Sequence, residues 1–164
     1  MFPARKIVCP TDFSEGASEA LENASQIAAH NSADVYLVHV IPVMLAETEP
    51  TLLVQIQDYE RLLQPEKRLR ELAEPLAAKG LTVHTVVGHG DAASEIVRIS
   101  QEVKADVIII STHGNTGWRR LAFGSVAEKV VRLATCPVLT IRYCKPHSPS
   151  KQMSTAGATS RRGP

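Results

Sequence analysis

Five short runs of aliphatic and β-branched residues recur along the chain and predict five buried strands. Several of these runs are apolar almost throughout rather than alternating with polar residues. That pattern is typical of strands covered on both faces of a parallel sheet. The runs are KIVCP (6–10), DVYLVHVI (34–41), LTVHTVV (81–87), DVIIIS (106–111) and PVLTIRY (137–143).

The segments between these runs carry apolar residues at helical spacing and predict helices. A break at Pro65 is expected because proline lacks a helical N–H donor, and Gly80 is a helix stop. Strands that alternate with helices predict an α/β fold, a five-stranded parallel doubly wound sheet of order 3-2-1-4-5 with helices on both faces. The predicted helices cover about 17–28, 52–79, 92–102 after a cap at Asp91, and 126–134.

The composition indicates one folded domain and a different C-terminal segment. With 164 residues and 44% hydrophobic residues, the chain can bury a core. Residues 1–144 are expected to form this domain. Residues 145–164 contain Pro, Ser, Thr, Gly and basic residues but no acidic one and no large apolar run, so they predict a disordered basic tail.

Several partners and compartments are disfavoured by the sequence. The net charge of +1 indicates no nucleic-acid partner, and no apolar run approaches the length of a membrane helix. The N-terminus does not resemble a signal peptide, and three scattered cysteines suit a reducing compartment. We therefore expect a cytoplasmic protein without membrane association.

Two polar segments follow the first and fourth predicted strands. CPTDFSE (9–15) follows the first, and STHGNTGWRRLAFGSVAEKVV (111–131) begins at the end of the fourth. Ligands in open parallel sheets bind beyond the carboxyl ends of strands where the winding direction reverses, so both segments would face one crevice if these strands are neighbours.

The second segment is suited to an anion. Glycines 114, 117 and 124 allow backbone N–H groups to turn toward a ligand, and a helix N-terminus at Ser125 would add unpaired donors and a positive dipole end. The alternative is structural: SVAE (125–128) matches a capping box, and a glycine loop can simply turn the chain.

Asp12 has two possible roles that do not exclude each other. DFSE (12–15) is also a capping-box pattern, so Asp12 could start the first helix. A carboxylate beside phosphates would repel them, so a nucleotide-binding Asp12 should contact hydroxyl or amino groups instead.

Catalytic signatures are missing. The chain has no P-loop motif, no G-x-G-x-x-G after its first strand and no G-x-S-x-G elbow. The histidines form no metal-ligand pattern, and His39 is expected to be packed or hydrogen-bonded in a strand. Cys9 is expected in the core and Cys136 in a structural role. We assign no catalytic residue and no metal site.

Three segments resemble the universal stress protein family. KIVCPTDFSEGASEAL (6–21) is similar to the family's opening strand and turn, and GDAASEIV (90–97) to the start of its third helix. STHGNTGWRRLAFGSVAEKVVRLATCPVLTIR (111–142) is similar to its closing segment. The resemblance extends from about Lys6 to Tyr143.

The resemblance implies an adenine nucleotide site. In the family's nucleotide-binding members a glycine, two residues, a second glycine, nine residues and a third glycine with serine or threonine form the motif. Here Ser111 replaces the first glycine. The added side chain bears on the affinity for the nucleotide rather than on the fold. Adenine and ribose contacts are implied at Pro10, Thr11, Asp12 and Val40, phosphate contacts at His113, Gly114, Gly124, Ser125 and Val126, and lining at Ile110 and Ser111.

The implied function is that of an ATP-binding stress-response regulator with at most slow ATP hydrolysis. ADP and AMP remain alternatives as ligands, and phosphate oxygens would be the natural ligands of any accompanying Mg²⁺. The family also implies a homodimer through the last strand, 137–143, whose exposed apolar edge would be buried by its symmetry mate. Two other hypotheses stay open, a protein-interaction module without nucleotide and an enzyme that consumes ATP.

Overall fold

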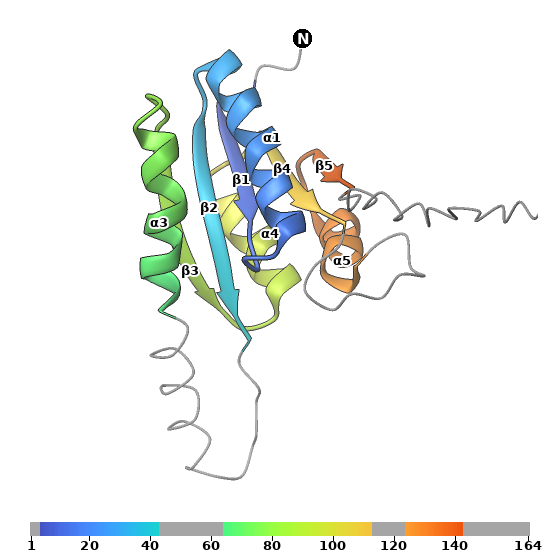
Figure 1. Cartoon of the computed structure of the whole chain (residues 1–164). Helices are drawn as coiled ribbons and strands as arrows, with labels where there is room; N and C mark the ends of the chain where they lie inside the picture. The colour runs from blue at the N-terminus through green and yellow to red at the C-terminus, as the bar shows by residue number, and fades with distance from the viewer. Residues whose placement is uncertain (1–3, 43–63, 113–123, 143–164) are drawn as a thin grey trace, which may run out of the picture.

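Five parallel strands form one sheet of order β3-β2-β1-β4-β5 in this computed structural model, which describes residues 4–42, 64–112 and 124–142 (Figure 1). The predicted fold class and strand order are confirmed. The strands are β1 (Lys6–Pro10), β2 (Asp34–Ile41), β3 (Val83–His89), β4 (Val107–Ser111) and β5 (Val138–Ile141).

The central strands are buried on both faces, which explains their unbroken apolar sequences. In β1, Ile7 and Cys9 belong to one core cluster and Val8 to the other. All three are fully buried. Because successive side chains of a strand point to opposite faces, one apolar run supplies two cores.

Two helices cover each face of the sheet (Figure 1). On one face lie α1 (Glu15–Asn31) and α3 (Pro65–Ala77), and on the other α4 (Ala92–Glu102) and α5 (Ser125–Leu133). The buried positions of α1 are mostly alanine, which lets this helix approach the sheet closely.

The predicted break at Pro65 coincides with the start of α3. Proline suits the first helical turn, where its missing N–H donor has no partner to lose. The helix ends at Ala77, just before the predicted stop at Gly80, which has a φ of +86°. The earlier part of that predicted helix lies outside the described residues, as do the tail and the boundary at 144.

An aspartate ties the start of β1 to the start of β4. Asp106 Oδ2 accepts hydrogen bonds from the N–H groups of Arg5 at 2.7 Å and Lys6 at 2.9 Å. Ile7 is then in register with Val107. The two strands run together from this end, so their carboxyl ends emerge side by side.

The two capping-box interpretations are wrong, although a helix does begin at Ser125 as predicted. Ser14, not Asp12, caps α1, because its hydroxyl accepts from Ala17 N while Asp12 lies two residues too early. Gly124, not Ser125, is the N-cap of α5, and Ser125 is its first helical residue. The predicted Asp91 cap of α4 is confirmed by a 3.0 Å hydrogen bond from Ser94 N.

None of the helices in the described ranges combines the length and the apolar character needed to cross a bilayer.

Substitutions at Ile109 should test the burial of the central strands on both faces of the sheet. This side chain is fully buried in β4. We expect Ile109→Val to lower the free energy of unfolding by about 1 kcal/mol and Ile109→Ala by about 3 kcal/mol, because the cavity left behind grows with the atoms removed. Urea denaturation measures both values. A loss below about 1 kcal/mol for Ile109→Ala would contradict the burial of this strand.

Candidate functional site

A cavity of about 300 Å³ opens at the carboxyl ends of β1 and β4. This is the point where the chain winds to opposite sides of the sheet, so no crossover covers it. All of the predicted site residues within the described ranges line the cavity, namely Pro10, Thr11, Asp12, Val40, Ile110, Ser111, Gly124, Ser125 and Val126. The other two predicted residues, His113 and Gly114, lie outside the described residues.

The turn after β1 is held by a series of short hydrogen bonds. Thr11 N donates to the carbonyl of Val38 on β2 at 2.7 Å. Thr11 Oγ1 accepts from Phe13 N, and Asp12 Oδ1 accepts from Ser14 N, both at 3.0 Å. These bonds fix the turn in a conformation in which Thr11 and Asp12 line the cavity.

His39 of β2 supports the same turn. Its Nδ1 lies 2.8 Å from the Thr11 carbonyl oxygen, to which a protonated Nδ1 donates. Its Nε2 is buried and has no hydrogen-bond partner among the described residues. The prediction that His39 is packed or hydrogen-bonded is confirmed, although the residue also lines the cavity.

The opposite wall is formed where β4, β5 and α5 meet. Thr112 N donates to the carbonyl of Ile141 at 2.9 Å, and Gly124 N donates to the carbonyl of Thr112 at 2.6 Å. A Cβ atom at position 124 would lie 3.1 Å from Thr112 O, so only glycine allows this approach without displacement. The first turn of α5 is thereby placed against the end of β4.

The N-terminus of α5 is suited to an anion. Its N-cap Gly124 offers no side-chain hydrogen bond to the first turn. The first N–H groups of a helix have no partner within the helix, and the helix dipole places positive potential there. Ser125, Val126 and Ala127 from this turn line the cavity, so it has an electropositive end.

The rest of the cavity lining is mostly aliphatic and includes one carboxylate. Val38, Val40, Ile96 and Ile110 supply aliphatic walls, and Asp12 supplies the carboxylate. A cavity with aliphatic walls, an acidic group and a helix N-terminus fits a ligand with a flat base, hydroxyls and phosphates.

Asp91 caps α4 beside this cavity and is joined to α5. Its Oδ1 accepts from the Ser94 hydroxyl at 2.6 Å and from Lys129 Nζ at 2.9 Å. The Ser94 hydroxyl, the Lys129 ammonium and Ser94 N together lower the pKa of Asp91 to about 2. The next residue, Ala92, lines the cavity, so this contact fixes the spacing of two helices at its rim.

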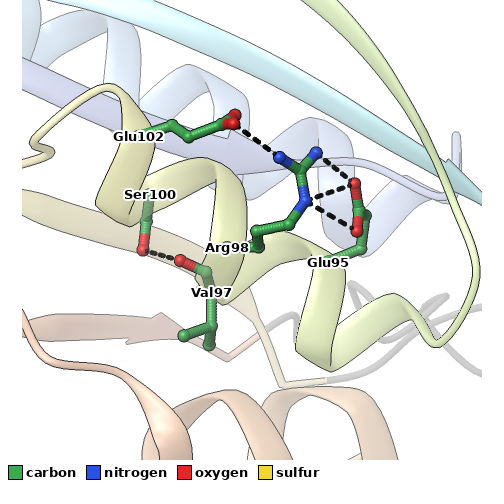
Figure 2. A network of polar contacts seen from close by, with 5 residues as sticks. All are labelled: Glu95, Val97, Arg98, Ser100 and Glu102. Carbon is green, nitrogen blue, oxygen red and sulfur yellow. Dashed lines mark hydrogen bonds and ion pairs between the residues drawn. The ribbon is translucent and has the colours of Figure 1, made fainter.

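A second ionic network lies on the outer side of α4 (Figure 2). Arg98 donates to Glu95 through Nε at 3.0 Å and also through Nη2. Its Nη1 lies 2.7 Å from Glu102 Oε1. Hydrogen bonding from Arg98 lowers the pKa of Glu95. Glu95 also covers Gly88 of β3, where a Cβ would lie 2.6 Å from Glu95 Cγ. The ion pairs lie within α4 and stabilise the helix, whereas the packing of Glu95 over Gly88 allows α4 to approach β3 closely.

The sequence analysis missed several cavity residues. Signals for some of them were present: Val38 shares a strand face with Val40, and Ile96 lies one helical turn after Ala92. The missed residues are Ala17, Val38, His39, Ala92, Ile96, Thr112 and Ala127.

The two described thiols, Cys9 and Cys136, do not line the cavity. Burial raises the pKa of the Cys9 thiol to about 12, as expected for a core residue. Burial also raises the pKa of Cys136, which packs against the second core cluster. Within the described ranges, no group of three or more His, Cys, Asp or Glu side chains could hold a metal ion.

Comparisons with known proteins agree on one family. The family model described as "Universal stress protein family" matches residues 3–142. Universal stress protein MJ0531 of Methanocaldococcus jannaschii is 36% identical, with 86% of this chain and 84% of that protein covered. The solved structure of MJ0577 from the same organism has a TM-score of 0.76 at 28% identity, covering 89% of this chain and all of that one.

A further solved structure is a universal stress protein in complex with cAMP. Its TM-score is 0.66 at 23% identity, with 85% of this chain and 97% of that chain covered. At this identity the likeness concerns the fold.

The Asp91 contact predicts a shifted titration. The folded-state pKa of about 2 lies below the ordinary carboxyl value of about 3.9. The ionised carboxylate therefore stabilises the fold in full at pH values above about 3.9. The stabilisation is lost as the pH falls through about 2. We expect Ser94→Ala and Lys129→Met each to raise the pKa of Asp91, followed by NMR of the carboxyl carbon. A wild-type pKa near 3.9 would contradict the contact.

Proposed function

This chain belongs to the universal stress protein family, and from that premise we propose that its cavity binds ATP and that the protein is a nucleotide-dependent stress-response regulator. The observation that carries the proposal is the arrangement of the cavity itself. Aliphatic side chains, the carboxylate of Asp12 and the first turn of α5 all line one cavity. The three parts match the three parts of a nucleotide.

The base is assigned to the aliphatic part of the cavity. Val40 and Val38 of β2 and Ile110 of β4 line it, and a purine ring would exclude water from their side chains. The backbone at the end of β2 can supply directional hydrogen bonds to the edge of the base, as backbone groups do in many ligand sites.

The ribose is assigned to Asp12. Its Oδ1 already accepts from Ser14 N at 3.0 Å, so the carboxylate is oriented before the ligand binds. A carboxylate is acceptor-only and therefore selects hydroxyl donors rather than phosphate oxygens. Asp12 would thus orient the nucleotide as well as contribute affinity.

The phosphates are assigned to the first turn of α5. Backbone N–H groups near Ser125 and Val126 and the helix dipole favour negative charge there. Any Mg²⁺ would be held mainly by phosphate oxygens, since the described side chains form no metal-binding group of their own.

The site is proposed to bind and sense ATP rather than to turn it over rapidly. Among the described cavity residues, the titratable side chains are Asp12 and His39. Asp12 accepts from Ser14 N, and His39 Nδ1 contacts the Thr11 carbonyl. Both side chains therefore support the turn. Rapid hydrolysis would instead need a general base directed at a water beside the terminal phosphate.

A universal stress protein of the same fold is known in complex with cAMP, which is an adenine nucleotide. This complex supports the proposal that the fold can bind an adenine nucleotide. The contacts proposed here rest on this chain's own cavity.

Asp12→Asn tests the orientation of the nucleotide. The amide oxygen can still accept from Ser14 N, while the charge that recognises ribose hydroxyls is lost. We expect the wild type to bind ATP about tenfold more tightly than 2′,3′-dideoxy-ATP, because hydrogen bonds to a charged group are worth about 1.5–3 kcal/mol. In Asp12→Asn the two affinities should become nearly equal. Calorimetric titration measures all four dissociation constants.

The control is Glu19→Gln, which removes one negative charge from an exposed residue of α1 and should leave the preference unchanged. An unchanged preference in Asp12→Asn would overturn the ribose assignment. Failure of the wild type to bind either nucleotide would refute ATP binding and favour a protein-interaction module.

We also propose a homodimer through β5. This strand forms one edge of the sheet. Leu139 is 40% exposed, and Val131 and Leu133 of α5 are each 46% exposed. An edge strand with exposed apolar side chains can pair with its symmetry mate and bury both edges.

Leu139→Lys should convert this dimer to a monomer, since it would place two ammonium groups in a self-complementary interface. Sedimentation velocity measures the change. Thr85→Lys is the matched control, because it introduces the same charge on an exposed position of the opposite edge strand, β3. The interface is elsewhere if Leu139→Lys remains dimeric, or if Thr85→Lys alone dissociates the protein.

A further inference from the structure

We propose that Phe13, whose ring contacts both the His39 imidazole and the Arg68 guanidinium, is a positioning residue that fixes the ligand-binding turn at Thr11 and Asp12. Helix α3 thereby controls the affinity of the cavity, although its residues do not line it. The inference rests on the proposed nucleotide site and adds a means of regulating it.

The first observation is the backbone of Phe13. Its φ is +62°, in the left-handed region that bulky residues rarely occupy. Such a conformation costs about 1–3 kcal/mol and persists only where surrounding contacts determine it. Phe13 immediately follows Asp12, so a change of this dihedral angle would alter the turn that carries Asp12.

The second observation is the set of contacts that hold this conformation. Phe13 N donates to Thr11 Oγ1 at 3.0 Å. The ring centroids of Phe13 and His39 lie 4.6 Å apart, and His39 Nδ1 lies 2.8 Å from the Thr11 carbonyl oxygen. His39 therefore contacts both the ring and the backbone of the same turn.

The third observation is the contact from α3. Arg68 Cζ lies 3.8 Å from the centroid of the Phe13 ring, which is the geometry of a cation–π interaction. The next residue, Leu69, is fully buried in the core cluster of this face. Core packing thus sets the place of Arg68, and Arg68 in turn holds the ring.

These contacts connect α3 to the cavity by one short path. If Arg68 leaves the ring, Phe13 loses a contact that opposes its backbone strain. The turn then spends more time in conformations in which Thr11 and Asp12 do not line the cavity. The apparent dissociation constant rises by the inverse of the competent fraction. A displacement of α3 would act in the same way.

The experiment compares Arg68→Ala with Arg70→Ala. Both remove one arginine from α3, but Arg70 is exposed. We expect Arg68→Ala to weaken ATP binding about three- to tenfold by calorimetry, the range that corresponds to a partly desolvated cation–π contact. Arg70→Ala should leave it unchanged, and Arg68→Lys should restore part of the affinity.

A double-mutant cycle separates positioning from a general charge effect. Phe13→Leu keeps an apolar side chain but removes the aromatic face. In that background Arg68→Ala should cause no further loss of affinity. An equal loss in both backgrounds, or an unchanged affinity in Arg68→Ala, would overturn the inference. Kd values refer to folded protein, checked by thermal unfolding without ligand.

Hydrogen exchange tests the inference independently of the proposed function. The Phe13 amide is bonded within the turn, so its exchange should be faster in Arg68→Ala than in the wild type and in Arg70→Ala. If the wild type binds no ATP, the proposed function fails while this measurement still decides the role of Arg68. Equal exchange rates in all three proteins would refute the positioning role.

Discussion

The parallel pairing of β1 with β4 is the constraint on which the site depends. Asp106 holds the starts of the two strands together, and their carboxyl ends then emerge as neighbours. The chain leaves β1 toward α1 on one face, whereas α5 lies on the other. Because these two helices lie on opposite faces of the sheet, neither covers the carboxyl ends of β1 and β4, and a cavity remains there. This pairing is what brings Asp12 and Gly124 to the same cavity.

The cavity lining combines groups of opposite electrostatic sign. Asp12 provides an acceptor, and the first turn of α5 provides backbone donors. A ligand with phosphates at one end and hydroxyls nearer its base is bound in one orientation, because the reverse would place phosphates against a carboxylate. The electrostatic arrangement therefore supports orientation as well as affinity.

The fold and much of the lining of the cavity could be predicted from the sequence, because both follow local patterns. Unbroken apolar runs predicted the strands, and turn residues after β1 and β4 predicted which segments meet. The capping roles given to Asp12 and Ser125 were wrong, because a capping-box pattern does not tell which of several nearby residues is the N-cap, although α5 does begin at Ser125. The Phe13–Arg68 contact joins residues far apart in sequence, so no local pattern could reveal it.

The most direct test of the nucleotide site is an NMR titration of the amide groups of the ¹⁵N-labelled protein with ATP. The account predicts that shifts concentrate at Thr11, Asp12 and Val40 on one side of the cavity and at Ser125 and Val126 on the other. The amide signals at the opposite end of the sheet, near Lys6 and Asp34, should stay in place. If millimolar ATP leaves the cavity signals unmoved, or moves only signals outside it, the cavity is not a nucleotide site.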